Sequence, residues 1–94
     1  MITRIVKLTI EPKKSNDFII FFEQNKQTIK TVNGCHDVSL LQDVKFPNIF
    51  FTYSYWENEE SLNKYRESDL FKIIWSFANS CFCDRPQAWT LIKK

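Results

Sequence analysis

Only one side chain in this 94-residue sequence has an ordinary pKa that suits acid and base chemistry near neutral pH, and it is His36. It lies in residues 35–42, where apolar and polar residues alternate. Alternation predicts a strand in which His36 shares a face with Val38 and Leu40. His36 is therefore a candidate catalytic base. The alternative is a structural or solvent-facing histidine.

Aromatic side chains offer a second kind of chemistry, the binding of a planar molecule. The sequence holds nine Phe, three Trp and three Tyr. Trp56 could donate its indole N–H to a substrate oxygen, and Tyr65 could orient one through its hydroxyl, so both are candidate catalytic residues. The alternative for Trp56 is a place in the core. The residues expected to complete the pocket are Phe50, Thr52, Ser54, Phe71 and Trp75.

The three cysteines, Cys35, Cys81 and Cys83, do not form a recognisable metal site. A tetrahedral zinc site needs about four ligands, and Cys81 and Cys83 have no histidine near them in the sequence. We therefore expect no metal. The N-terminus has no export signal, so we expect a cytoplasmic protein whose thiols are reduced.

Composition excludes several other classes of protein. Gly34 is the only glycine, so there is no glycine-rich loop to hold a nucleotide phosphate. The 13 basic and 11 acidic residues are scattered along the chain and form no basic stripe, so we expect no nucleic-acid partner. No apolar run approaches the ~20 residues of a membrane helix, so we expect no membrane partner.

The order of elements follows from the spacing of apolar residues. Pro12 ends the first strand, and Asn33 with Gly34 ends the first helix. The pattern predicts one α+β domain over residues 1–94, with the ferredoxin-like order β-α-β-β-α-β, an antiparallel sheet and a second helix broken near Ser68. The predicted strands span residues 2–10, 35–42, 49–56 and 87–92, and the predicted helices span residues 13–32, 59–67 and 70–80.

The third strand, residues 49–56, carries aromatic residues on both of its faces. Helices normally cover one face of such a sheet, and a chain of this length cannot supply a third layer. Large exposed apolar patches are rare on monomers. We therefore expect a homodimer that buries the two open sheet faces against each other.

Several segments together resemble the antibiotic biosynthesis monooxygenase domains, although each is a weak signal alone. The resemblance spans most of the chain. It implies a ferredoxin-like protomer within a dimeric α/β barrel and a pocket between sheet and helices in each subunit. The segments that carry it are Asn33-Gly34-Cys35, Leu40-Leu41-Gln42-Asp43, Pro47-Asn48, Tyr53-Ser54-Tyr55-Trp56-Glu57-Asn58 and Tyr65-Arg66-Glu67-Ser68-Asp69-Leu70-Phe71.

The resemblance also marks individual positions. The polyketide oxygenases of this family place an Asn, a Trp and a Tyr in the pocket, and the corresponding residues are Thr52, Trp56 and Leu62. In the haem-degrading branch the Asn, Trp and His fall on Val6, Tyr65 and Trp75. Because Trp75 cannot ligate iron, haem degradation is not expected.

The function that the resemblance implies is the binding, and cofactor-independent oxygenation, of a planar aromatic or quinol-type molecule. No cofactor is expected for such a reaction. Two alternatives stay open. One is a non-catalytic dimeric binding module that keeps the barrel. The other is a small-metabolite isomerase that would use His36 in the pocket.

Overall fold

The computed structural model describes residues 1–94 and confirms the predicted α+β order, with the second helix divided in two. No helix is both long and apolar enough to cross a membrane. The elements are β1 (Ile2–Thr9), the 3-10 turn η1 (Pro12–Lys14), α1 (Ser15–Lys30), β2 (Cys35–Gln42), β3 (Ile49–Trp56), α2 (Glu59–Arg66), α3 (Asp69–Cys81) and β4 (Gln87–Ile92).

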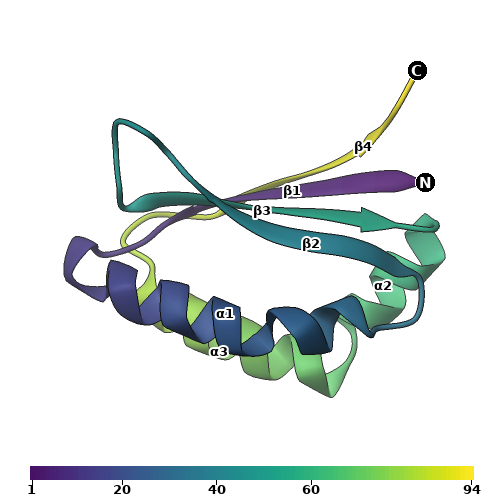
Figure 1. Ribbon diagram of the computed structural model, residues 1–94, viewed down its shortest axis with the longest axis horizontal. Helices are drawn as coiled ribbons and strands as arrows, with labels where there is room; N and C mark the ends of the chain where they lie inside the picture. The colour runs from purple at the N-terminus through teal and green to yellow at the C-terminus, as the bar shows by residue number, and fades with distance from the viewer.

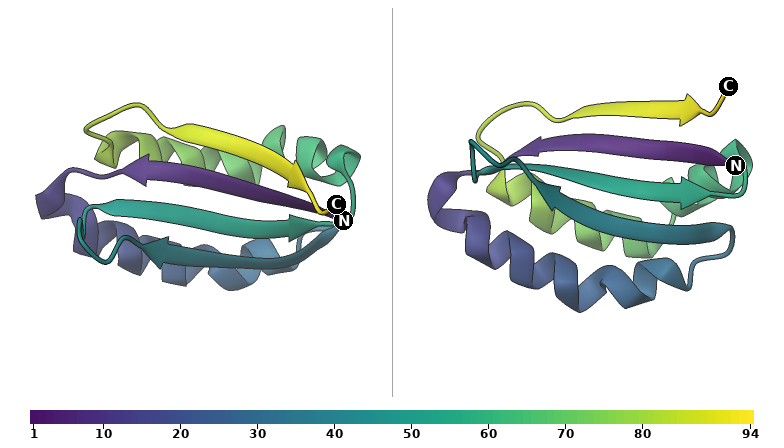
Figure 2. Two further views of the ribbon diagram at one scale, coloured as in Figure 1. Left: turned by 90° about the horizontal axis from the view of Figure 1, so that it is seen from above. Right: turned by 45° about the horizontal axis from the view of Figure 1, so that its top comes forward.

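The four strands form one antiparallel sheet in the order β2-β3-β1-β4. All three helices lie on one face of this sheet, and the opposite face is uncovered (Figure 1). Viewed from above, α1 runs below β2 while α3 runs below β1 and β4 (Figure 2). The molecule therefore has two layers, with one open sheet face.

Local signals in the sequence account for the ends of the helices. Gly34 has a φ of +86°, in the left-handed region that favours glycine, and a side chain there would also overlap Ser61 on α2. The Asn58 side chain accepts a hydrogen bond from Ser61 N, which caps α2. Ser68 caps α3 in the same way, accepting from Phe71 N, and this second cap is where the helix breaks.

The start of β2 departs from simple alternation. Cys35 pairs with Trp56 and Asp37 pairs with Tyr55, so His36 is the extra residue of a β-bulge. The prediction that His36 shares a face with Val38 is wrong for this reason: His36 is exposed, and Cys35 takes the inward position. Asp37 beside it is held by Lys30, with 3.2 Å between the carboxylate oxygen and Nζ.

The buried residues form two clusters beneath the sheet. The first packs near the end of β1, and the second packs between α1 and β2. Trp56 and Leu62 are buried separately, near the start of α2. The members of the first cluster are Leu8, Ile10, Phe18, Phe50, Ala78 and Cys81, and those of the second are Phe22, Ile29 and Val38.

Candidate active-site pocket

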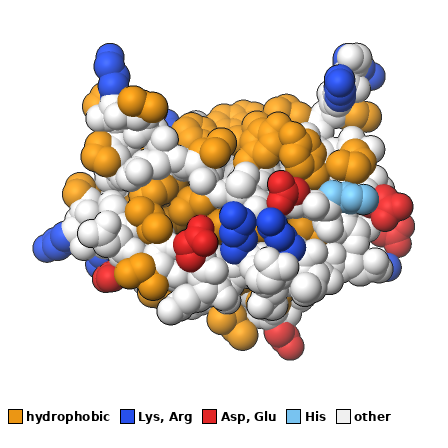
Figure 3. Space-filling model, viewed as in Figure 1, with side chains coloured by type: hydrophobic (Ala, Val, Ile, Leu, Met, Phe, Trp, Pro, Cys, Tyr) orange, Lys and Arg blue, Asp and Glu red, His pale blue; other side chains and the backbone are white.

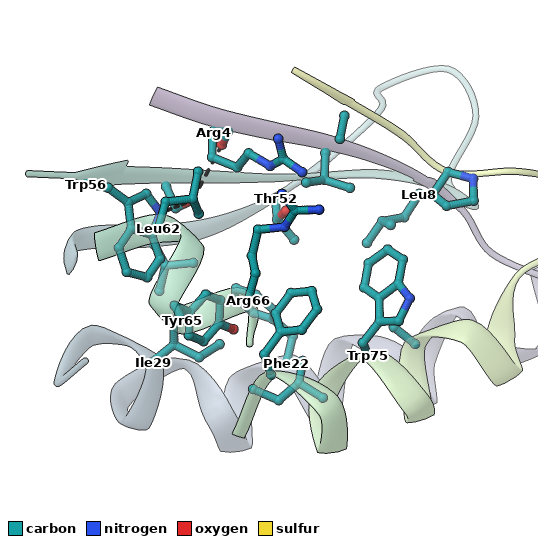
Figure 4. A pocket seen from close by; sticks show the side chains of 18 of the residues that line it. Arg4, Leu8, Phe22, Ile29, Thr52, Trp56, Leu62, Tyr65, Arg66 and Trp75 are labelled. Atoms are coloured by element: carbon teal, nitrogen blue, oxygen red, sulfur yellow. Dashed lines mark hydrogen bonds between the residues drawn. The ribbon is translucent and has the colours of Figure 1, made fainter. Parts of the chain in front are cut away.

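A cavity of about 330 Å³ lies between the sheet and the helices, and residues of both core clusters line it. Fifteen of its 20 lining residues are hydrophobic, so the few polar ones decide what it can recognise. Figure 4 shows the lining from close by, with the sheet above and the helices below. The polar side chains that line it are Arg4, Thr52, Ser54, Tyr65 and Arg66.

Most of the site residues predicted from the sequence meet at this cavity. Two do not. Phe50 faces the helices but is 1% exposed and packs against Phe18 with 5.4 Å between ring centroids. His36 lies outside because of the bulge. The predicted residues that line the cavity are Thr52, Ser54, Trp56, Tyr65, Phe71 and Trp75.

Aromatic rings form a continuous wall of the cavity along α2 and α3. Trp56 stacks on Tyr65 at 5.0 Å between centroids, and Tyr65 meets the edge of Phe71 at 5.2 Å. Phe71 in turn stacks on Trp75 at 5.8 Å. Offset and edge contacts of this kind are the arrangements that aromatic rings prefer, and they leave flat surfaces on which a planar ligand can stack.

The indole N–H of Trp56 is already used within the protein. It donates to Ser54 Oγ at 3.0 Å, and the Ser54 hydroxyl donates to the backbone oxygen of Arg4 at 3.5 Å. Trp56 itself is 1% exposed. The free indole donor expected from the sequence is therefore absent, and Trp56 takes the alternative role of a core residue at the border of the cavity.

Tyr65 keeps the donor role that its type suggests. Burial raises the pKa of its hydroxyl to about 12, with a smaller contribution from nearby Cys35, so the phenol stays protonated at neutral pH. Its hydroxyl forms no hydrogen bond within the chain, and the residue is half-buried. It can donate a hydrogen bond to a ligand oxygen, but it cannot serve as a base near pH 7.

Two arginines that the sequence reasoning missed face the same cavity. Arg4 extends from β1 and Arg66 from the last turn of α2, and their side chains reach toward one another beside Thr52 (Figure 4). Arg4 Nη1 donates to Thr90 Oγ1 at 2.7 Å. Burial, together with the charge of Arg66, lowers the pKa of Arg4 below its usual value.

Neither arginine has an acidic partner. The four ion pairs of the chain involve Lys13, Lys14, Lys30 and Lys64, and no carboxylate lies within 4.0 Å of Arg4 or Arg66. The sequence did carry a signal for both. Arg4 has the parity of Val6 and Leu8 along β1, and Arg66 stands one helical turn after the buried Leu62.

Comparison with known proteins gives this pocket a context. Residues 1–74 match the family model described as antibiotic biosynthesis monooxygenase. The chain belongs to the antibiotic biosynthesis monooxygenase family. The matched region includes the whole of β1 to α2 and the part of α3 that carries Phe71. No curated protein matches the sequence.

Solved structures carry the likeness over the full chain, β4 included. A conserved protein from Methanosarcina mazei Go1 is 25% identical, with a TM-score of 0.91 and coverage of 100% of this chain and 94% of the other. A structure named antibiotic biosynthesis monooxygenase is 15% identical, with a TM-score of 0.92 and coverage of 100% and 99%. At 15% identity, the likeness to this second structure shows a shared fold and nothing more.

A Bordetella bronchiseptica protein, provisionally named an antibiotic biosynthesis monooxygenase, is 23% identical with a TM-score of 0.89, covering 99% of this chain and 96% of the other. In the present family member, the positions that the resemblance assigned to the polyketide oxygenase pocket all line the cavity, and they are Thr52, Trp56 and Leu62. The two larger polar groups expected there are replaced by a hydroxyl and an alkyl side chain.

Proposed function

We propose that this family member is a cofactor-independent monooxygenase that acts on a planar aromatic or quinol-type substrate. The observation that supports this most directly is the aromatic-walled cavity with the unpaired Tyr65 hydroxyl beside it. A volume of about 330 Å³ suits a compact molecule of two or three rings. Stacking on Trp75 and Phe71 would orient such a ring system.

The reaction draws its electrons from the substrate. With an anthrone as the model substrate, one oxygen atom of O₂ becomes the new carbonyl oxygen, the other leaves as water, and the ring CH₂ group supplies both hydrogens of that water. The substrate loses four electrons and O₂ gains four. The protein contributes a water-poor cavity and groups that favour the deprotonated, electron-rich form of the substrate.

Oxygen uptake with a panel of anthrones and naphthalene diols tests the proposal. We expect protein-dependent oxygen consumption, and we expect Trp75→Ala to reduce it by at least tenfold by removing a cavity wall. Ile73→Ala is the matched control, because Ile73 lies on the same helix and is 64% exposed. If no substrate in the panel is turned over while the same compounds bind, the non-catalytic binding module becomes the better account.

The isomerase alternative depends on His36 as a base within the pocket. His36 is exposed on the bulge of β2 and does not line the cavity. The isomerase alternative therefore has no candidate base in the pocket.

We also propose that the protein is a homodimer formed through the open sheet face. Hydrophobic side chains gather along this face, at the upper edge of Figure 3. Leu41, Trp89 and Leu91 are 42–49% exposed there. Leu41 lies beside Phe51 of β3, whereas Trp89 and Leu91 lie beside β1. A second copy would cover them. Light scattering at micromolar concentration tests this, and a monomeric mass would overturn it.

A further inference from the structure

The mostly apolar cavity carries two positive charges, those of Arg4 and Arg66. Arg4 is the only charged residue among the inward-facing positions of the sheet, and its neighbours across the strands there are Thr90 and Ser54. It is half-buried, and Arg66 adds a second cation to the same space. The two cations repel each other across this space, and an anion bound between them would relieve that repulsion.

No anion of the chain fills this role. All four ion pairs lie elsewhere and use lysines. Thr90, the one hydrogen-bond partner of the Arg4 side chain, is neutral and occupies a single donor of a guanidinium that has five. A second copy packed on the open face would lie on the opposite side of the sheet from both arginines (Figures 1 and 4).

We propose that Arg4 and Arg66 bind the carboxylate of the substrate, so that the ligand is a planar aromatic carboxylic acid. This inference rests on the proposed function and narrows its substrate class. A guanidinium is planar and presents paired N–H donors that match a carboxylate. Arg66 is exposed and marks the solvent side of the cavity, whereas Arg4 lies deeper. The carboxylate sits between them and the rings stack on Phe71 and Trp75.

The arginine pair also has a consequence for the chemistry. The bound carboxylate opposes ionisation of a neighbouring hydroxyl, but the two cations exceed it by one charge, so the net field favours the phenolate form. The phenolate is the electron-rich species that reacts with O₂. Because the chain has no histidine in the cavity and Tyr65 stays protonated, electrostatic stabilisation of the phenolate takes the place of a strong base.

The test compares three ligands that share a 1-naphthol ring: 1-hydroxy-2-naphthoic acid, its carboxamide of nearly the same shape, and 1-naphthol itself. Quenching of tryptophan fluorescence, with calorimetry as a check, measures the dissociation constants. We expect the carboxylate to bind about 10- to 100-fold more tightly than the carboxamide, as for charge-assisted hydrogen bonds. Arg4→Gln and Arg66→Gln should each remove most of that difference and leave 1-naphthol binding within about twofold.

Arg85→Gln is the matched control, since Arg85 is the only other arginine, is exposed and does not line the cavity. It removes the same charge and should keep the preference for the carboxylate. Arg4→Lys keeps the positive charge but loses the planar guanidinium, so it should keep only part of the preference for the carboxylate. Circular dichroism confirms that each variant is folded.

Equal binding of the three ligands, or an equal loss of all three in the arginine variants, would overturn the inference. So would a failure of 1-hydroxy-2-naphthoic acid to bind the wild-type protein at millimolar concentration.

These outcomes are distinct from failure of the proposed function. Tight carboxylate binding without oxygen consumption by 1,4-dihydroxy-2-naphthoic acid would leave the anion site in place and remove the oxygenase. Turnover of neutral quinols without a preference for carboxylates would support the oxygenase and overturn the anion site.

Discussion

Both faces of β3 carry aromatic residues, but their polar groups are organised differently. On the inward face, Thr52 and Ser54 stand between Phe50 and Trp56 and border the cavity. On the outward face, the Tyr53 and Tyr55 hydroxyls bond each other at 2.8 Å, and their rings meet edge to face at 5.1 Å. The two outward hydroxyls of β3 thus satisfy one another.

This difference separates two uses of the same alternating strand. Polar atoms around an enclosed space can recognise a ligand. Arg4 and Arg66, which have no acidic partner, add two further polar groups to the inward side. Polar atoms that pair among themselves within an apolar surface favour association with another such surface. The following predictions test whether the inward face carries stability and ligand binding while the outward face carries assembly.

The largest effect is expected from the two tryptophans on opposite faces. Trp56→Ala should lower the free energy of unfolding by about 3 to 5 kcal/mol, because the side chain is fully buried. Trp89→Ala should cost much less in the isolated chain, since Trp89 is 42% exposed. Urea unfolding followed by circular dichroism measures both. Equal losses would remove the distinction between the faces.

A charge on the outward face should act on assembly instead. Trp89→Glu should weaken self-association by about 2 kcal/mol, because it replaces an aromatic contact of the proposed interface with a charge. Its far-ultraviolet circular dichroism spectrum should stay that of the wild type. Sedimentation velocity measures the shift from dimer to monomer. Ile73→Glu, on the exposed side of α3, is the control and should leave the dimer intact.

The element order and most of the pocket could be predicted from alternation, helical spacing and capping residues, because these signals are local. Alternation fails at a bulge, and nothing in the types of Cys35, His36 and Asp37 marks an inserted residue. Phe50 shows a second limit. Alternation along β3 predicts that Phe50 faces the helices. Whether it also reaches the cavity depends on how closely Phe18 approaches the sheet.

Arg4 and Arg66 were not predicted as site residues, for a different reason. The parity of Arg4 and the turn spacing of Arg66 were both visible in the sequence. They were missed because the inward face was identified from its apolar residues alone. That two side chains 62 positions apart share one cavity depends on how α2 crosses the sheet, which no local pattern encodes.

Tyr65 on the inward face and Tyr55 on the outward face should affect the pH dependence of stability differently. In Tyr65 the pKa is about 12 in the folded state against 10 when unfolded, so the folded state favours the neutral phenol. The resulting stability is present below pH 10 and is lost as the pH rises from 10 to 12, on the order of 2 kcal/mol in all. Tyr65→Phe should flatten the fall in stability over that range.

Tyr55 on the outward face provides the contrast. Its pKa is also raised, first by its hydrogen bond with Tyr53, but it lies on the open surface where solvent screens the effect. Tyr55→Phe should therefore flatten the same pH profile less than Tyr65→Phe does. Urea titrations between pH 9 and about pH 11 measure both profiles. A larger effect from Tyr55→Phe would contradict the burial of Tyr65.

The smallest expected effect compares two serines, one on each face. Ser54 accepts the buried Trp56 N–H at 3.0 Å, so Ser54→Ala leaves that donor without a partner and should cost about 1 to 2 kcal/mol. Ser39 on the outward face donates to the Tyr53 backbone oxygen at 3.5 Å, a longer bond in a more open setting. Ser39→Ala should change the free energy of unfolding by less than about 0.5 kcal/mol. If instead Ser54→Ala is silent, a ligand oxygen or a water can reach the Trp56 indole, and the donor role expected of Trp56 returns.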